Sequence, residues 1–154
     1  MIQSPKLKSD LTIVEAPLIR LIDKPRILLA DNDMITSKLL TKISVRHGYE
    51  FVSVPDAREA YRVLKSDARF SVALFNTSTA HFQSLNILQY MKSEKRLMRI
   101  PVMIVIDEGG LKSIDIGFVA RAIAFLSKPF TAEQLHRILL IALSQNAKEL
   151  SAAE

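Results

Sequence analysis

The sequence contains no cysteine, which excludes disulfide bonds and thiolate metal sites and is compatible with a cytoplasmic location. Its three histidines, His47, His81 and His136, are scattered and predict no metal site. No apolar run reaches membrane-spanning length, and the polar first ten residues are not followed by the apolar region of a signal peptide. Glycine is scarce, and the pair Gly109–Gly110 predicts a turn instead of a phosphate-binding loop. We therefore expect no enzyme, no cofactor and no membrane partner.

What the sequence does contain is enough apolar material for one folded domain. Hydrophobic residues make up 49% of the 154 residues, which is sufficient for a sizeable core. The net charge is +5. Such an excess of lysine and arginine is compatible with binding of nucleic acid, a nucleotide or an acidic protein, and equally with a plain solvated basic surface. Net charge alone leaves these alternatives open.

From Arg26 onward, short apolar runs alternate with segments of helical periodicity. The apolar runs predict five strands, at residues 27–30, 51–54, 72–75, 102–106 and 122–127. Helices are expected at residues 34–47, 56–64, 85–96, 111–121 and 131–147. Unbroken apolar strands are typical of a parallel sheet that is covered on both faces. The pattern therefore predicts an α/β fold with an open doubly wound five-stranded parallel sheet at residues 26–147, an N-terminal arm at 1–25 and a C-terminal tail at 148–154.

In such a sheet, functional residues gather at the carboxyl ends of the strands. The residues at these positions are Asp31, Asn32 and Asp33 after the first strand, Asn76 after the third, Ile106 after the fourth and Lys128 after the fifth. We expect their side chains to form one pocket, because the carboxyl ends of parallel strands meet at the same edge of a sheet.

Two of these segments resemble the receiver domains of bacterial response regulators. The strand at residues 27–30, followed by Asp31-Asn32-Asp33, is similar to the acidic start of that family. Residues 125–130, Phe-Leu-Ser-Lys-Pro-Phe, match its fifth strand and its lysine–proline motif, and Pro101 lies where its fourth strand begins. The resemblance covers residues 26–147 and implies a flavodoxin-like receiver fold in a two-component or phosphorelay pathway.

The resemblance also implies a phosphoryl-transfer pocket. A carboxylate accepts the phosphoryl group, two carboxylates hold magnesium, and a hydroxyl and a lysine contact the phosphoryl oxygens. Here Asn76 stands at the acceptor position, Asn32 at a metal ligand and Ile106 at the hydroxyl. An amide is no nucleophile for an acyl phosphate, and isoleucine cannot donate a hydrogen bond. The following loop has Ala80 and Ser84 where the family has proline and glycine.

Asp31, Asp33 and Lys128 keep charged groups in this pocket. Asp31 matches the remaining metal acid, and Asp33 is a neighbouring acid that could compensate for Asn32. Without an acceptor carboxylate, we expect Lys128 to form a structural ion pair with Asp31. Asn76 is expected to hydrogen-bond Lys128 or Asp31 and to fix one conformation. The sequence thus predicts a degenerate phosphorylation pocket without phosphotransfer and without a bound metal.

Two basic clusters provide candidate binding surfaces. Lys38, Lys42 and Arg46 recur every four residues on the first helix, opposite Leu39 and Ile43. In the receiver family this helix contributes to docking with kinases or phosphotransfer proteins. The second cluster, at the end of the third predicted helix, contains Lys92, Lys95, Arg96 and Arg99. Either cluster suits an acidic partner or an anionic nucleotide, and the alternative is a solvated face.

The last predicted helix is apolar on nearly all sides between residues 138 and 143. Leu140 and Ile141 lie on the flanks of its core-facing side. The resemblance places the family's signalling and dimer face here, where Phe125 matches an aromatic residue whose rotamer reports activation. We predict a protein-binding or homodimer face around Leu140, Ile141, Phe125 and Ile116. The alternative is that the N-terminal arm covers these residues.

These features lead to one principal hypothesis and two alternatives. The principal hypothesis is a non-catalytic, stand-alone pseudo-receiver adaptor that binds a signalling protein, such as a histidine kinase, a phosphotransfer protein or a regulator. The second is a module that binds a nucleotide second messenger or nucleic acid through the basic clusters, with nucleic acid the less favoured ligand. The third is a phosphoacceptor that remains active with atypical residues.

Overall fold

The computed structural model describes residues 24–110 and 122–153. Within them, five parallel strands form one sheet in the order β2-β1-β3-β4-β5. The strands are β1 (Arg26–Ala30), β2 (Glu50–Val54), β3 (Val72–Asn76), β4 (Val102–Ile106) and β5 (Ala124–Ser127). This is the flavodoxin-like strand order, in which the strand sequence reverses between β1 and β3. The predicted open, doubly wound, five-stranded parallel sheet is confirmed.

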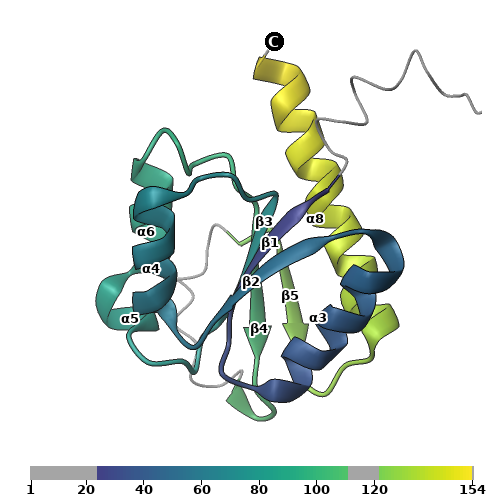
Figure 1. Cartoon of the computed structure of the whole chain (residues 1–154). Helices are drawn as coiled ribbons and strands as arrows, with labels where there is room; N and C mark the ends of the chain where they lie inside the picture. Colours follow the sequence, from purple (N-terminus) through teal and green to yellow (C-terminus); the bar gives the residue numbers. More distant parts are fainter. Residues whose placement is uncertain (1–23, 111–121, 154) are drawn as a thin grey trace, which may run out of the picture.

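Helices cover both faces of the sheet (Figure 1). They are α3 (Met34–His47), α4 (Ala57–Ser66), α5 (Phe82–Leu85), α6 (Ile87–Ser93) and α8 (Ala132–Ala153). On one face, α3 and α8 pack side by side, and Leu40 and Leu139 meet Leu74 of the sheet. On the other face, α4, α5 and α6 pack around Phe75. The two helical layers explain why the strands carry apolar side chains on both sides.

The central strands β3 and β4 are buried along their whole length. Leu74 and Met103 belong to the cluster beneath α3 and α8, whereas Phe75 and Ile104 belong to the cluster beneath α4, α5 and α6. Since successive side chains of a strand point to opposite faces, both sets must be apolar. The edge strand β2 is only partly buried. The rigid centre of the sheet thus ends at the strand termini that carry the predicted pocket.

Several helix ends follow from local sequence. The Asp33 carboxylate accepts a hydrogen bond from the backbone N–H of Ile35 at 2.8 Å and caps α3. Gly48 ends the same helix with a φ of 77°, which suits glycine because it has no Cβ.

Two other helices begin with side-chain caps. The carboxylate of the predicted cap Asp56 accepts a hydrogen bond from the backbone N–H of Glu59 at the start of α4. At the start of α8, Thr131 and Gln134 exchange reciprocal side chain–backbone hydrogen bonds, which is a capping box.

Three predicted boundaries are wrong. The single helix expected at residues 85–96 is replaced by α5 and α6, which meet at Asn86 with a positive φ of 46°. The fifth strand begins at Ala124 instead of Ala122. The last helix continues to Ala153, since no proline or glycine interrupts it, so most of the predicted C-terminal tail at 148–154 is helical.

Two predicted segments lie outside the described residues. They are most of the arm at 1–25 and the helix expected at 111–121, which includes Ile116. Within residues 24–110 and 122–153, no helix combines the length and the apolar composition that a membrane crossing requires.

Replacing a central core side chain should cost much more stability than replacing an exposed one. Leu74→Ala removes buried methyl groups between the sheet and α3/α8 and should lower the free energy of unfolding by about 2–5 kcal/mol in urea titrations. Val45→Ala is the matched control, because Val45 is 81% exposed, and it should change that energy by less than about 0.5 kcal/mol. Equal losses in both variants would contradict this packing.

Candidate functional site

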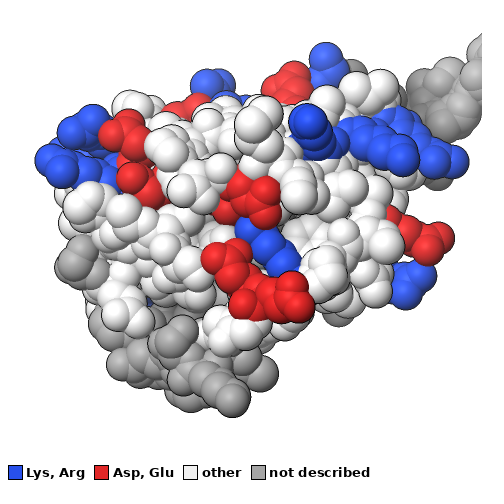
Figure 2. Space-filling view, turned by 90° about the horizontal axis from the view of Figure 1, so that it is seen from below, with Lys and Arg blue, Asp and Glu red and all other residues white. Residues whose placement is uncertain are grey.

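The carboxyl ends of β1, β3, β4 and β5 form one charged pocket beside the position where the strand order reverses. Its side chains belong to Asp31, Asp33, Asn76, Asp107 and Lys128. The strands point to the bottom of Figure 1, so Figure 2 looks onto this edge and shows acidic side chains around a basic one. The structure therefore brings together most of the residues that the sequence placed here.

Lys128 is the centre of the pocket. Its Nζ atom lies 2.9 Å from Asp31 Oδ2, 2.9 Å from Asp33 Oδ2 and 3.1 Å from Asp107 Oδ1. The lysine side chain is largely buried, and the Asp31 side chain is completely buried. Burial alone disfavours the ammonium ion, but the hydrogen bonds to the three carboxylates outweigh it and raise the pKa of Lys128. The ion pair expected between Lys128 and Asp31 is present and belongs to a larger cluster.

Asn76 joins two of these carboxylates from the buried end of β3. Its Nδ2 atom donates to Asp31 Oδ1 at 3.2 Å and to Asp107 Oδ1 at 2.8 Å. Its Oδ1 atom accepts from the backbone N–H of Ser78 at 2.8 Å. Both amide hydrogens and the amide oxygen are therefore engaged. Of the two expected partners, Asp31 is the one that Asn76 binds, and Asp107 accepts a second hydrogen bond from the same amide.

The two partly exposed carboxylates are held in their charged form. The hydrogen bond from Lys128, supported by the backbone N–H of Ile35, lowers the pKa of Asp33. For Asp107, burial favours the neutral acid, but hydrogen bonds from Asn76, Lys128 and Ser78 outweigh it and lower the pKa. Both shifts favour the ionised cluster near neutral pH.

Ile106 and Asn32 are at the pocket edge but take no part in this network. The Ile106 side chain is 2% exposed and packs in the apolar cluster beneath α4, α5 and α6. Its backbone oxygen accepts a hydrogen bond from the backbone N–H of Lys128 at 2.7 Å. Asn32 is exposed, and in the described part of the chain its side chain makes no hydrogen bond to the pocket. The Ile106 side chain offers no polar group, and the Asn32 amide lies outside the hydrogen-bond network of the pocket.

The fold raises the question of whether a magnesium ion fits here. Three carboxylates are chemically suitable ligands for a hard cation. However, the Lys128 ammonium already lies within 3.1 Å of each of them. Across residues 24–110 and 122–153, no group of three acidic or histidine side chains is arranged to hold a metal ion. The donor set as arranged fits an ammonium group and does not fit magnesium.

Asp107 is a residue of the site that was not predicted from the sequence. It comes directly after β4 and the segment turns back through a hydrogen bond from the Gly110 N–H to its backbone oxygen. The available signal was its position, since an acidic residue directly after a parallel strand lies at the pocket edge.

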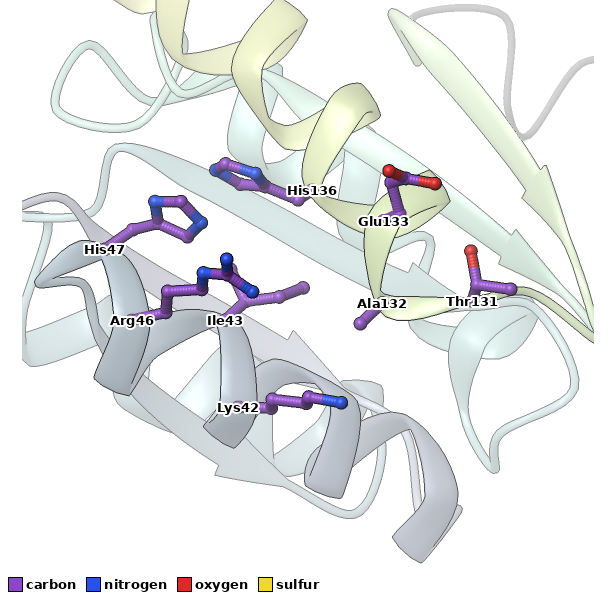
Figure 3. Close-up of a pocket in the computed structure, with 8 residues that line it drawn as sticks. All are labelled: Lys42, Ile43, Arg46, His47, Thr131, Ala132, Glu133 and His136. Carbon is purple, nitrogen blue, oxygen red and sulfur yellow. The ribbon is translucent and has the colours of Figure 1, made fainter.

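The basic stripe predicted on the first helix is exposed on α3, with Lys38, Lys42 and Arg46 pointing away from the core. Lys42 and Arg46 line a groove of about 490 Å³ between α3 and the start of α8 (Figure 3). Across the groove, the rings of His47 and His136 stack with centroids 3.9 Å apart. Burial, together with the charges of His47 and Arg46, lowers the pKa of His136. The groove therefore stays less positive than its residue types suggest.

The apolar residues predicted as an interface are exposed. The exposed fractions are 47% for Phe125 on β5, 49% for Leu140 and 54% for Ile141 on α8. Monomeric proteins expose large apolar side chains singly, whereas a group of them marks a contact surface. Their role in binding stays a prediction, and Ile116 lies outside the described residues.

The strand order and the paired helical layers define a flavodoxin-like α/β fold, with a charged pocket at its switch point. No protein-family model matches the chain. The chain is 24% identical over 122 residues to "Chemotaxis protein CheY1" of Helicobacter pylori, an alignment that covers 79% of this chain and 98% of that protein.

Solved structures of low sequence identity share the fold. A CheY-like response regulator receiver domain protein from Methanospirillum hungatei superposes with a TM-score of 0.68 at 22% identity, covering 82% of this chain and 98% of the other. The receiver domain of the sensor histidine kinase PA1611 from Pseudomonas aeruginosa, which has magnesium coordinated in its active site cleft, gives 0.66 at 18% identity, covering 79% and 98%. The resemblance to response-regulator receiver domains is confirmed.

Removing the central ammonium should destabilise the protein most near neutral pH. Lys128→Met leaves three carboxylates facing one another and should lower the free energy of unfolding by about 3 kcal/mol at pH 7. Because the pKa values of Asp33 and Asp107 are lowered in the folded state, their contribution is present above the unfolded pKa and is lost as the pH falls through the folded values. The difference from the wild type should therefore shrink near pH 3.

Urea titrations of both proteins at the two pH values measure this difference. Lys38→Met removes one exposed charge and serves as the control, with little expected effect at either pH. A loss for Lys128→Met that is the same at both pH values would show that packing, and not the ion cluster, is responsible.

Proposed function

We propose that this chain is a non-catalytic pseudo-receiver adaptor of a two-component or phosphorelay pathway, which acts by binding another protein without aspartyl phosphorylation. The observation that carries the proposal is Asn76. An amide stands at the end of β3, and its two hydrogens and its oxygen are all engaged by Asp31, Asp107 and Ser78. A carboxamide held in this way cannot attack a phosphodonor.

The rest of the pocket supports the same proposal. Phosphoryl transfer needs a metal ion and donors placed where charge develops. Lys128 is already neutralised by three carboxylates, and Ile106 offers an aliphatic side chain at the hydroxyl position. We infer a structural role for the pocket, which holds four strand ends in one arrangement. We propose no catalytic role for this pocket.

A fixed arrangement suits an adaptor whose surface does not depend on phosphorylation. The related CheY1 carries the description of a chemotaxis protein, and the PA1611 domain belongs to a histidine kinase. We propose a partner from the same kinds of pathway, namely a histidine kinase, a phosphotransfer protein or a regulator. We propose a cytoplasmic location with such a partner, and the absence of cysteine is compatible with it.

The proposed docking face is the exposed apolar side of α8, with Leu140 and Ile141 at its centre. Protein interfaces have an apolar core with a polar rim, and a few well-buried side chains contribute most of their binding energy. The α3 stripe of Lys38, Lys42 and Arg46 is a second candidate face for an acidic partner. A second copy of the chain is another candidate occupant of the α8 face.

Exposure to a phosphodonor should leave the protein unmodified. Incubation with acetyl phosphate and magnesium, followed by intact-protein mass spectrometry, should show no added phosphate, because Asn76 is not a nucleophile. A receiver domain with an aspartate at this position is the positive control. The variant Asn76→Asp should also show no robust turnover, since Ile106 and Asn32 remain. A mass increase of one phosphate on the wild type would falsify the proposal.

An acidic substitution on the α8 face should disrupt partner binding without unfolding the domain. Leu140→Asp should reduce recovery of the bound partner in pull-downs by about tenfold or more, because it places a charge in an apolar contact. Val45→Asp is the matched control, as it introduces the same charge at an exposed aliphatic position on α3. Light scattering reports whether the partner is a second copy. If partner recovery falls with Val45→Asp and not with Leu140→Asp, the docking face lies on α3.

A further inference from the structure

A second charged site lies at the opposite, amino-terminal edge of the sheet. A groove of about 460 Å³ opens between the residues that precede β1 and β3, the segment that links α6 to β4, and Asn146 of α8. Six of its lining residues are basic, and no acidic residue is among its described lining residues. The basic residues are Lys24, Arg26, Arg69, Lys95, Arg96 and Arg99. The two edges of the sheet thus carry opposite types of charged cluster.

Two guanidinium groups of the groove are fixed by the protein itself. Arg26 donates to Asp67 at 3.3 Å and to the backbone oxygen of Arg69 at 2.6 Å, and it lies 4.5 Å from the centre of the Phe70 ring. Arg96 donates to the backbone oxygen of Leu64 at 3.3 Å. Because these side chains are already ordered, a ligand pays less conformational entropy when it binds beside them.

Lys95 and Arg99 carry positive charges that no described acidic side chain neutralises. In the described part of the chain, neither side chain forms an ion pair or a hydrogen bond, and both are exposed. The other four basic residues pair with only three acids, Glu50, Asp67 and Glu94. The groove therefore has six cations against three anions and a net positive potential that attracts an anionic ligand.

We propose that this groove binds a small ligand with two or more linked phosphate groups, of the nucleoside polyphosphate class. Arginine presents planar donors that match phosphate oxygens, and lysine adds point charge. Cations that converge from several chain segments suit a compact polyanion better than a single monoanion. The volume of the groove, about 460 Å³, lies in the range of binding sites for small molecules.

A strand of nucleic acid is the alternative ligand, and the geometry favours the smaller one. Proteins that bind single strands combine a basic groove with exposed aromatic rings on which successive bases stack. Phe70 is the aromatic residue among the described lining residues, but it is only 5% exposed and lies beneath Arg26. The groove has charge for phosphates and no platform for a run of bases.

Isothermal titration of the full chain tests the site directly. The probes are tripolyphosphate, ATP without magnesium and a short oligothymidine, each at low and moderate salt. We expect tripolyphosphate and ATP to bind with one-site stoichiometry and to weaken as salt increases, and the oligonucleotide to bind more weakly than ATP. Absence of polyphosphate binding, or tighter binding of the oligonucleotide that grows with its length, would overturn the proposal.

Matched double variants separate a built site from general charge attraction. Lys95→Gln with Arg99→Gln should weaken tripolyphosphate and ATP binding by about tenfold or more, since both lose direct phosphate contacts. Arg58→Gln with Lys65→Gln removes the same charge from α4 and should change affinity by less than about twofold. Equal losses of affinity in the two double variants would overturn the proposed site. Circular dichroism verifies that each variant is folded.

Discussion

The ammonium of Lys128 between three carboxylates is the interaction on which the site depends. It joins the end of β5 to Asp31 after β1 and to Asp107 after β4. Asp33 extends the cluster further, because one of its oxygens pairs with Lys128 while the other caps α3. Without the ammonium, three like charges would lie close together in a partly buried place, which is far costlier than leaving a surface charge unpaired. The positions of β1, β4, β5 and α3 are thus linked through one cation.

Asn76 supports this cluster in a way that an aspartate could not, because its amide donates hydrogen bonds to the carboxylates. A fourth carboxylate at the end of β3 would add negative charge beside Asp31 and Asp107, and it would need a metal ion to balance it. The amide instead donates to both carboxylates and spreads their charge without adding any. The amide at the end of β3 and the ammonium at the end of β5 therefore balance the same carboxylates.

The sequence predicted the sheet well because the physics of a doubly covered strand is local. Runs such as residues 72–75 are apolar at every position, and few other structures demand that. The break between α5 and α6 was missed because Asn86 adopts a positive φ, which depends on the surrounding packing. Asp107 was missed for a related reason. Its position at a strand end was visible in the sequence, but its contact with Lys128 depends on the path of the chain after β4.

The parallel arrangement also explains how one small domain can carry two charged sites of different character. All carboxyl ends lie at one edge and all amino ends at the other, so the carboxylate cluster and the basic groove are separated by the length of the strands. Between them, β3 and β4 are buried and closely packed. A ligand at the basic edge could influence the pocket only if it bound two arrangements of this core with different affinity. Because the Lys128 cluster stabilises one arrangement, the two edges are expected to act as independent surfaces, and the net charge of +5 for the whole chain describes neither site.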